Sequence, residues 1–146
     1  MKRKIFLEII SFLLVLLFVY AAMNKLNDYE KFVIQIGQSP LLMGLGPYVA
    51  GPVLGVELLI PVMLASGRLR LIGFYIAFTM MVMFTAYIVA ILNFSSHIPC
   101  SCGGVLEKLS WHEHLLFNVT FVVLSLAGVI LETVERNLML PQSGIV

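Results

Sequence analysis

Residues 69–92 read LRLIGFYIAFTMMVMFTAYIVAIL, an apolar run in which Arg70 is the only charged residue. A helix needs roughly 20 predominantly apolar residues to cross the hydrocarbon core of a bilayer. This run is long enough, and similar runs lie at about 5–23, 48–66 and 112–132. The sequence therefore predicts an all-α membrane protein built as a bundle of four transmembrane helices.

The composition excludes several classes of protein. The 146 residues are 60% hydrophobic and 12% charged, with a formal net charge of +1. An ordinary soluble domain is roughly 45–50% apolar and about 25% charged. The near-neutral chain has no basic surface that would indicate nucleic-acid binding. We therefore expect a single membrane domain over residues 1–146, with the lipid bilayer as a partner and no nucleic acid.

The basic residues indicate how the bundle is oriented. Four crossings return both ends of the chain to one side, which receives six Lys and Arg residues against three on the other. By the positive-inside rule the richer side faces the cytoplasm. The expected location is the cytoplasmic (inner) membrane, with both termini inside and the segment after the third span facing the periplasm or exterior. The inner set comprises Lys2, Arg3, Lys4, Arg68, Arg70 and Arg136.

The first span has an alternative interpretation as a signal peptide, because Val19-Tyr-Ala21 resembles a cleavage region. The length of the run and the presence of Glu8 within it argue against cleavage. Four spans is the preferred prediction.

A short amphipathic helix is predicted between the first two spans. Asn27-Asp28 is a candidate helix cap, and Phe32 with Ile36 forms an apolar stripe. Gly37 and Ser39-Pro40 predict its end. We expect this helix to lie on the outer surface of the membrane.

Helical spacing indicates which faces of the spans look inward. Steps of three and four residues place polar and small side chains of the first and fourth spans on single stripes. Lipid favours an apolar exterior, so these stripes should face the bundle interior. Gly51 and Gly55 form a small-xxx-small pair that predicts a close helix approach. The stripes comprise Glu8, Ser11, Val15, Phe18, Ala22 and Lys25, and Trp111, His114, Asn118, Ser125 and Glu132.

The segment His97-Ile-Pro-Cys100-Ser-Cys102-Gly-Gly104 contains both cysteines of the chain. A disulfide requires Cα atoms within about 7 Å, and the small residues between and after the cysteines permit this approach. Strained, exposed disulfides exchange readily. The pattern predicts that Cys100 and Cys102 are a redox pair with a catalytic role. Nearby groups whose positive charge would favour the thiolate are His97, Lys108 and His112.

Two other interpretations of this segment stay open. The first is a static disulfide that pins the loop. The second is a zinc or copper site, which a Cys₂His₂ set would suit. The spacing matches no recognised finger pattern, and two histidines two apart on a helix point to different faces, so no metal ligand is assigned. The candidate ligands would be His97, Cys100, Cys102, His112 and His114.

Glu57 lies about nine residues into the second span, where an ionisable group is costly and suggests a function. Pro61 has no N–H to donate to the Glu57 carbonyl, so a kink is predicted there. Glu57 is either a proton-relaying or quinone-facing acid, or a structural acid bonded to Tyr75, Thr79 or Tyr87. Lys25 is expected to pair with Asp28 at the membrane surface.

Several short elements together resemble the MauE branch of the DoxX-like superfamily, over nearly the whole chain. The resemblance implies a four-span bundle in the cytoplasmic membrane that works in thiol and disulfide electron transfer beside a thioredoxin-like partner. MauE-type proteins are associated with maturation of the disulfide-rich small subunit of methylamine dehydrogenase. The resemblance makes Cys100 and Cys102 the redox pair and Glu57 and Lys25 lesser candidates. The elements are Ala21-Ala-Met-Asn-Lys25-Leu-Asn-Asp28, Ser39-Pro40, Gly55-Val-Glu57-Leu-Leu and Ile98-Pro-Cys100-Ser-Cys102-Gly.

The sequence thus predicts a membrane thiol–disulfide electron relay. A reduced periplasmic thiol protein attacks the Cys100–Cys102 disulfide, and the electrons pass to a second partner or to a quinone, the candidate cofactor. Whether the protein is an enzyme stays open, because a relay protein shows no catalytic activity in the absence of its partner. The alternative function is a non-catalytic metal-binding or assembly protein.

Overall fold

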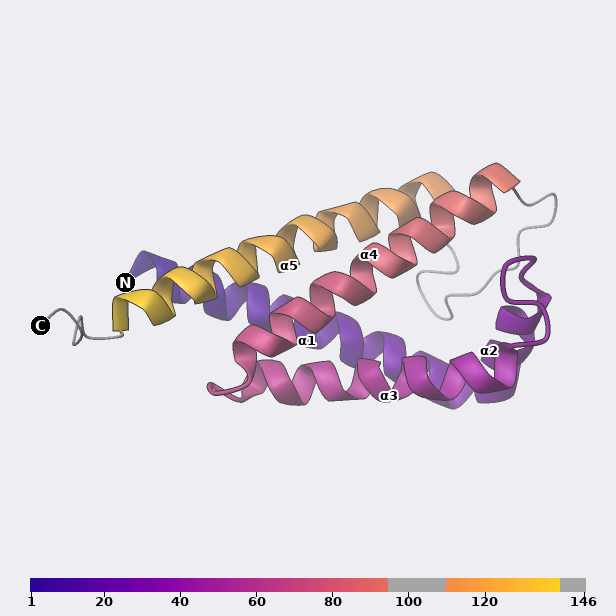
Figure 1. Cartoon of the computed structure of the whole chain (residues 1–146), viewed down its shortest axis with the longest axis horizontal. Helices are drawn as coiled ribbons and strands as arrows, with labels where there is room; N and C mark the ends of the chain where they lie inside the picture. Colours follow the sequence, from indigo (N-terminus) through magenta and orange to yellow (C-terminus); the bar gives the residue numbers. More distant parts are fainter. Residues whose placement is uncertain (95–109, 140–146) are drawn as a thin grey trace, which may run out of the picture.

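The computed structural model describes residues 1–94 and 110–139 and folds them into helices. Four helices are long and apolar enough to cross a membrane, namely α1, α3, α4 and α5. The short α2 lies between the first two (Figure 1). The predicted all-α bundle with one short amphipathic helix is confirmed. The bounds are α1 Lys2–Asn27, α2 Tyr29–Gln38, α3 Gly46–Ala65, α4 Arg70–Phe94 and α5 Trp111–Met139.

The four spanning helices form a closed ring. Helix α1 packs against α3 and α5, and α4 packs against the same two neighbours. Figure 1 shows the start of α1 and the end of α5 at one end of the bundle, with α2, the end of α4 and the start of α5 at the other. These ends are called here the terminal end and the α2 end.

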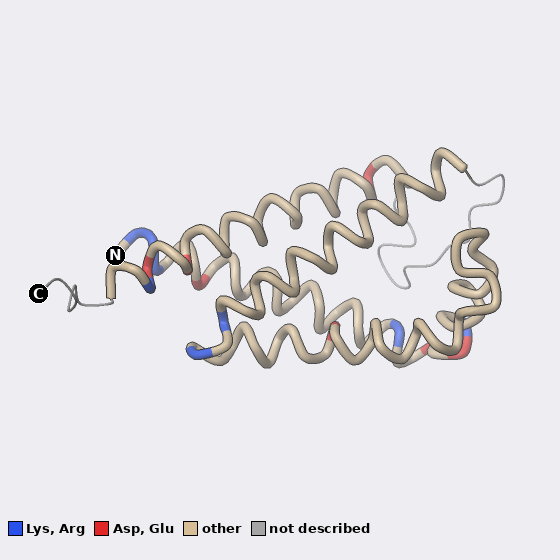
Figure 2. Tube along the Cα trace, in the orientation of Figure 1, with Lys and Arg blue, Asp and Glu red and all other residues tan. Residues whose placement is uncertain are grey.

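The helices are longer than the apolar runs that predicted them. At about 1.5 Å per residue the 26 residues of α1 extend for about 39 Å, beyond the roughly 30 Å of bilayer hydrocarbon. Its extra turns carry Lys2 and Lys4 at one end and Asn24 and Asn27 at the other. Figure 2 shows charged residues gathered near both ends of the bundle. Polar residues therefore continue these helices into the headgroup regions.

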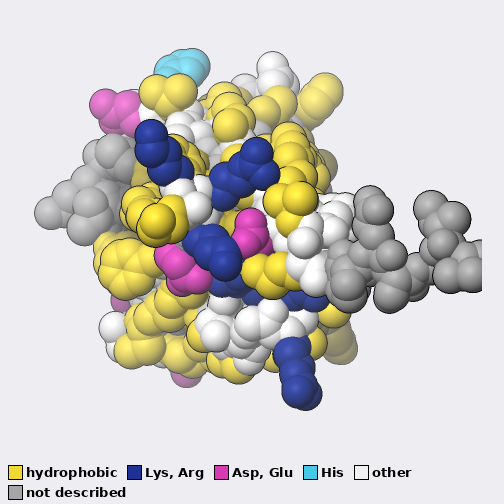
Figure 3. Space-filling view, turned by 90° about the vertical axis from the view of Figure 1, so that its left-hand side faces the viewer, with side chains coloured by type: hydrophobic (Ala, Val, Ile, Leu, Met, Phe, Trp, Pro, Cys, Tyr) yellow, Lys and Arg dark blue, Asp and Glu magenta, His cyan; other side chains and the backbone are white. Residues whose placement is uncertain are grey.

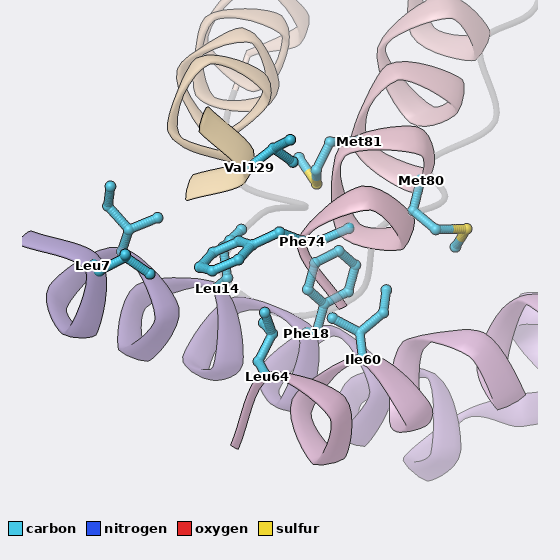
Figure 4. Packing of buried hydrophobic residues seen from close by; sticks show 11 residues of the cluster. Leu7, Leu14, Phe18, Ile60, Leu64, Phe74, Met80, Met81 and Val129 are labelled. Carbon is cyan, nitrogen blue, oxygen red and sulfur yellow. The ribbon is translucent and has the colours of Figure 1, made fainter. Parts of the chain in front are cut away.

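A layer of large apolar side chains fills the ring in its half nearer the terminal end. Phe18 of α1, Ile60 of α3 and Phe74 of α4 are almost fully buried and converge there (Figure 4). Other apolar side chains, including Phe12 of α1 and Val62 of α3, point outward and stay exposed. An apolar exterior around an apolar core is what a bilayer requires, and dispersion contacts hold such a core together.

Among the glycines of the spanning helices, the tightest contact with another spanning helix lies at Gly128 and not at the predicted glycine pair. A Cβ atom built on Gly128 of α5 would lie 2.4 Å from the Phe74 ring of α4. Gly55 has no atom within 4 Å of such a Cβ, and Gly51 has only the Tyr29 hydroxyl at 3.8 Å. The prediction for Gly51 and Gly55 was wrong because spacing identifies small residues without showing which face meets a neighbour.

The predicted inward stripes are largely confirmed. Ser11 and Phe18 of α1 are buried, as are Asn118 and Ser125 of α5. Glu8 is the exception, because 70% of its side chain is exposed. It lies near the start of α1, where a carboxylate can reach the membrane surface.

An ionic network closes the terminal end. The Arg70 Nε lies 2.8 Å from Oε2 of the buried Glu132, and its Nη1 lies 2.7 Å from Oε1 of Glu8. Arg136 donates from Nε to Glu132 at 3.0 Å and from Nη2 to the Gly67 and Arg68 carbonyls. Figure 3 shows basic and acidic side chains meeting on this face. The network joins α1, α4 and α5 to the α3–α4 turn.

Replacing Gly128 with alanine should loosen the contact between α4 and α5. The new methyl group overlaps the Phe74 ring, and overpacking of this kind costs about 1–3 kcal/mol. The matched control is Gly55→Ala, which meets open space and gains helix propensity. Unfolding in mixed micelles should show a lower free energy of unfolding for Gly128→Ala only. Equal stability of the two variants would contradict this packing.

Candidate functional site: a cavity lined by a buried ion pair

A cavity of about 190 Å³ lies toward the α2 end, and all five helices contribute to its wall. Most of the wall is apolar, from residues such as Phe18, Ile36 and Val53. A small set of polar side chains interrupts it. An apolar cavity with a few convergent polar groups is the usual form of a small-molecule site. The polar set comprises Lys25, Glu57, Tyr87, Trp111, His114 and Asn118.

The central feature of the wall is an ion pair between α1 and α3. Lys25 Nζ donates a hydrogen bond to Oε1 of Glu57. The Glu57 side chain is fully buried and that of Lys25 is 11% exposed. Lys25 occupies the last turn of α1, while Glu57 lies in the middle of α3. Because α1 and α3 pack against each other, these two positions meet inside the bundle.

Two aromatic rings surround the same ammonium group. The Lys25 Nζ lies 5.1 Å from the ring centroid of Phe32 in α2 and 5.1 Å from that of Phe84 in α4. Cations are attracted to aromatic faces at such distances. A single ammonium thereby contacts α2, α3 and α4 from its position on α1.

Burial of this pair is costly. Removing two charges from water costs several kcal/mol per ion, and their attraction repays this only with good geometry and further hydrogen bonds. Only one carboxylate oxygen of Glu57 is satisfied, because Oε2 is buried without a hydrogen-bond partner in the described residues. Replacing a buried ion pair by apolar residues of similar size often leaves a protein at least as stable. The pair is therefore a candidate functional group.

The start of α5 forms the far wall of the cavity. Ser110 and Glu113 form a capping box, in which the Ser110 amide donates to Oε2 of Glu113 at 2.9 Å and the Glu113 amide donates to Oγ of Ser110. This cap fixes the first turn of α5. The rings of Trp111 and His114 stack at 6.2 Å with an 8° interplanar angle. Asn118 follows one turn later and donates to the His114 carbonyl.

The structure identifies the partner of Glu57 and tests the expected pair of Lys25 with Asp28, whereas the proton-relaying and quinone-facing roles of Glu57 stay predictions. Glu57 is partnered by Lys25, whereas Tyr75 is exposed and Thr79 donates to the Tyr75 carbonyl, so neither holds Glu57. The expected Lys25–Asp28 pair was wrong, because the Lys25 side chain turns into the bundle toward Glu57.

Other residues of the site were only partly foreseen. The helical spacing of α5 correctly predicted that His114 and Asn118 face the bundle interior. It did not predict that they line a cavity. The Ser-x-x-Glu pattern of Ser110 and Glu113 is the sequence signature of a capping box, and it could have predicted the helix cap that positions His114 and Asn118.

Cys100 and Cys102 lie outside the described residues, as do His97 and Lys108. The catalytic assignment of the cysteines therefore stays a prediction, and so does the metal alternative. Within residues 1–94 and 110–139, no three His, Cys, Asp or Glu residues form a group that could hold a metal ion. His112 is exposed and His114 is buried, so the two point to different faces as predicted.

Comparison with known proteins gives one family. Residues 3–131 match the family model described as methylamine utilisation protein MauE. No curated protein and no solved structure matches the chain. The matched range takes in nearly all of α1, the whole of α3 and α4, and α5 up to residue 131, eight residues before the end of that helix at Met139. The wider DoxX-like resemblance stays a prediction.

Removing one partner of the buried pair should destabilise the bundle strongly. Glu57→Leu leaves the Lys25 ammonium buried without its carboxylate, which costs about 3–5 kcal/mol. The double variant Lys25→Met with Glu57→Leu should recover most of that loss because no unpaired charge remains. Unfolding free energies in mixed micelles measure both effects.

The control is the pair of Lys4 and Glu135, 3.4 Å apart with the Lys4 side chain 64% exposed. Lys4→Met should cost less than about 1 kcal/mol. If Glu57→Leu costs no more than Lys4→Met, the Lys25–Glu57 pair does not hold the helices together.

Proposed function

The chain belongs to the MauE family of methylamine utilisation proteins, and from this premise we propose that it is a membrane thiol–disulfide relay. Cys100 and Cys102 are its reacting pair, and Glu57 with Lys25 lines the adjoining site. The four apolar helices make it a multi-pass membrane protein. Its thiol partner is a thioredoxin-like protein, and the disulfide-rich small subunit of methylamine dehydrogenase is the final substrate.

The exchange proceeds by two thiol–disulfide steps. A thiolate of the reduced partner attacks one sulfur of the Cys100–Cys102 disulfide and forms a mixed disulfide, releasing the other cysteine as a thiol. The second thiol of the partner then breaks the mixed disulfide. The partner leaves with a disulfide, and Cys100 and Cys102 hold the two electrons and two protons it has lost.

One observation carries the proposal. The chain segment with both cysteines joins Phe94, the last residue of α4, to the start of α5. The first residues of α5, Trp111 and His114, line the cavity together with the Lys25–Glu57 pair. Eight peptide units separate Cys102 from Ser110, and an extended chain covers at most about 3.3–3.6 Å per residue. The covalent connection attaches both cysteines to the α2 end of the bundle, toward which the cavity lies, and this supports thiol chemistry at that end.

The orientation is also a proposal. The terminal end carries Lys2, Arg3, Arg68 and Arg136, which supports a cytoplasmic position for both termini by the positive-inside rule. The cysteine segment then faces the periplasm, where disulfides persist.

A serine at one cysteine should trap the partner. In Cys102→Ser the Cys100 thiol can attack the disulfide of an oxidised partner, which is the exchange run in reverse, but this chain has no second cysteine to complete it, so a covalent adduct should accumulate on non-reducing gels and disappear with reductant. Mass spectrometry identifies the joined peptides. Cys100→Ser with Cys102→Ser is the control and should give no adduct and no growth on methylamine. Normal methylamine growth of that double variant would refute the relay and favour the assembly alternative.

Labelling tests the orientation. A membrane-impermeant maleimide added to intact cells after mild reduction should modify Cys100 and Cys102. The matched probe is Gly67→Cys in a protein with both natural cysteines replaced, because Gly67 lies exposed in the α3–α4 turn with open space around it. This thiol should react only after the cells are opened. The reverse pattern would place the cysteines in the cytoplasm.

A further inference from the structure

One buried oxygen in the cavity wall lacks a partner. Glu57 is fully buried, and Lys25 satisfies its Oε1, whereas Oε2 has no hydrogen-bond partner in residues 1–94 and 110–139. A buried polar atom left unpaired is destabilising, and such atoms are uncommon in folded proteins. A bound molecule that donates a hydrogen bond at this position would remove the penalty. Glu57 lines the cavity, so the cavity is where that molecule belongs.

The size and walls of the cavity favour a flat ring. Its volume is about 190 Å³, and a dry cavity of about 150 Å³ in another protein is large enough for benzene. Aromatic side chains from four of the helices line it, among them Phe32 in α2, Phe84 in α4 and Trp111 in α5. Aromatic walls pack well against an aromatic or quinonoid ring.

The cavity also has a side that reaches the lipid-facing surface. Met83 of α4 lines the cavity, yet 58% of its surface is exposed. Since α4 spans the membrane, the exposed part of Met83 faces hydrocarbon. A ligand can therefore enter from the bilayer and leave an apolar tail there.

We propose that this cavity binds the ring of a membrane quinone, with Lys25 and Glu57 as its polar contacts. The Lys25 ammonium donates a hydrogen bond to a carbonyl oxygen of the oxidised ring. Glu57 Oε2 accepts one from a hydroxyl of the reduced ring. An ion pair with one free acceptor oxygen thus serves both redox forms of the same ligand.

The inference rests on the proposed relay for its redox step. Reduced Cys100 and Cys102 hold two electrons and two protons, and a lipid quinone accepts two of each. The dithiol is oxidised to the disulfide while the quinone is reduced to the quinol, so atoms and electrons balance. Binding itself requires only the described cavity, and it can be measured without the thiols.

The single tryptophan of the chain, Trp111, lies in the cavity wall and reports on binding. The full-length protein in nanodiscs is titrated with ubiquinone that carries one isoprenoid unit, and Trp111 emission is recorded. Saturable quenching is expected in the wild type and equally in the variant with both cysteines replaced by serine. The same titration with the corresponding ubiquinol tests the Glu57 contact: Glu57→Gln should weaken the apparent affinity for the reduced ring about tenfold or more, because its hydroxyl loses a charged acceptor.

A matched pair of substitutions fills the cavity or leaves it open. Ala21 of α1 lines the cavity, whereas Ala86 of α4 is exposed and lies outside its wall. Ala21→Phe should abolish saturable quenching and Ala86→Phe should retain it. A prenol with the same tail but no ring should not compete.

Quenching that rises linearly and equally in both phenylalanine variants, or full competition by the prenol, would overturn the quinone site. That result leaves the mixed-disulfide adduct of the relay untouched. Conversely, saturable binding without any adduct would refute the relay and uphold the site, so the two failures are distinguishable.

Discussion

The charge pair between Lys25 and Glu57 constrains how the bundle is assembled. In a low-dielectric interior neither charge is tolerated without the other, so the last turn of α1 must lie beside the middle of α3. The rings of Phe32 and Phe84 then enclose the ammonium from α2 and α4. The contacts of this one ammonium group therefore fix how α1, α2, α3 and α4 are positioned along the bundle axis relative to one another. The cavity wall forms where they meet.

The two ends of the bundle have different physical characters. At the terminal end, Arg70 and Arg136 satisfy Glu132 from both sides and join three helices to a turn. The Phe74 ring packed on Gly128 makes the layer beside this network tight. Toward the α2 end, the helices enclose open volume, and Oε2 of Glu57 has no hydrogen-bond partner among the residues that the structure describes. A closed end that holds the bundle and an open end with room for a ligand suit the proposed relay, because exchange and binding would then need no loosening of the fold.

The sequence predicted the spanning helices well because a lipid environment restricts which backbone structures and which side chains can face it. Long apolar runs require helices, and the stripe through Asn118 and Ser125 must turn inward, as both do. Contacts between distant segments were harder to predict. Lys25 has Asp28 close by in sequence, and only the packing of α1 on α3 brings Glu57 nearer. Gly51 and Gly55 matched a spacing rule, but the tight glycine contact between two spanning helices is at Gly128 instead.

The account depends most on electrons moving from the two thiols to a quinone held at the Lys25–Glu57 pair. Counting maleimide-reactive thiols by mass, in reduced protein in nanodiscs before and after adding a short-chain ubiquinone, tests this directly. The wild type should lose both thiols as one equivalent of quinol forms. The double variant Lys25→Met with Glu57→Leu, which is predicted to keep the fold, should retain them. A wild type that keeps both thiols, or a double variant oxidised at the same rate, would contradict the account.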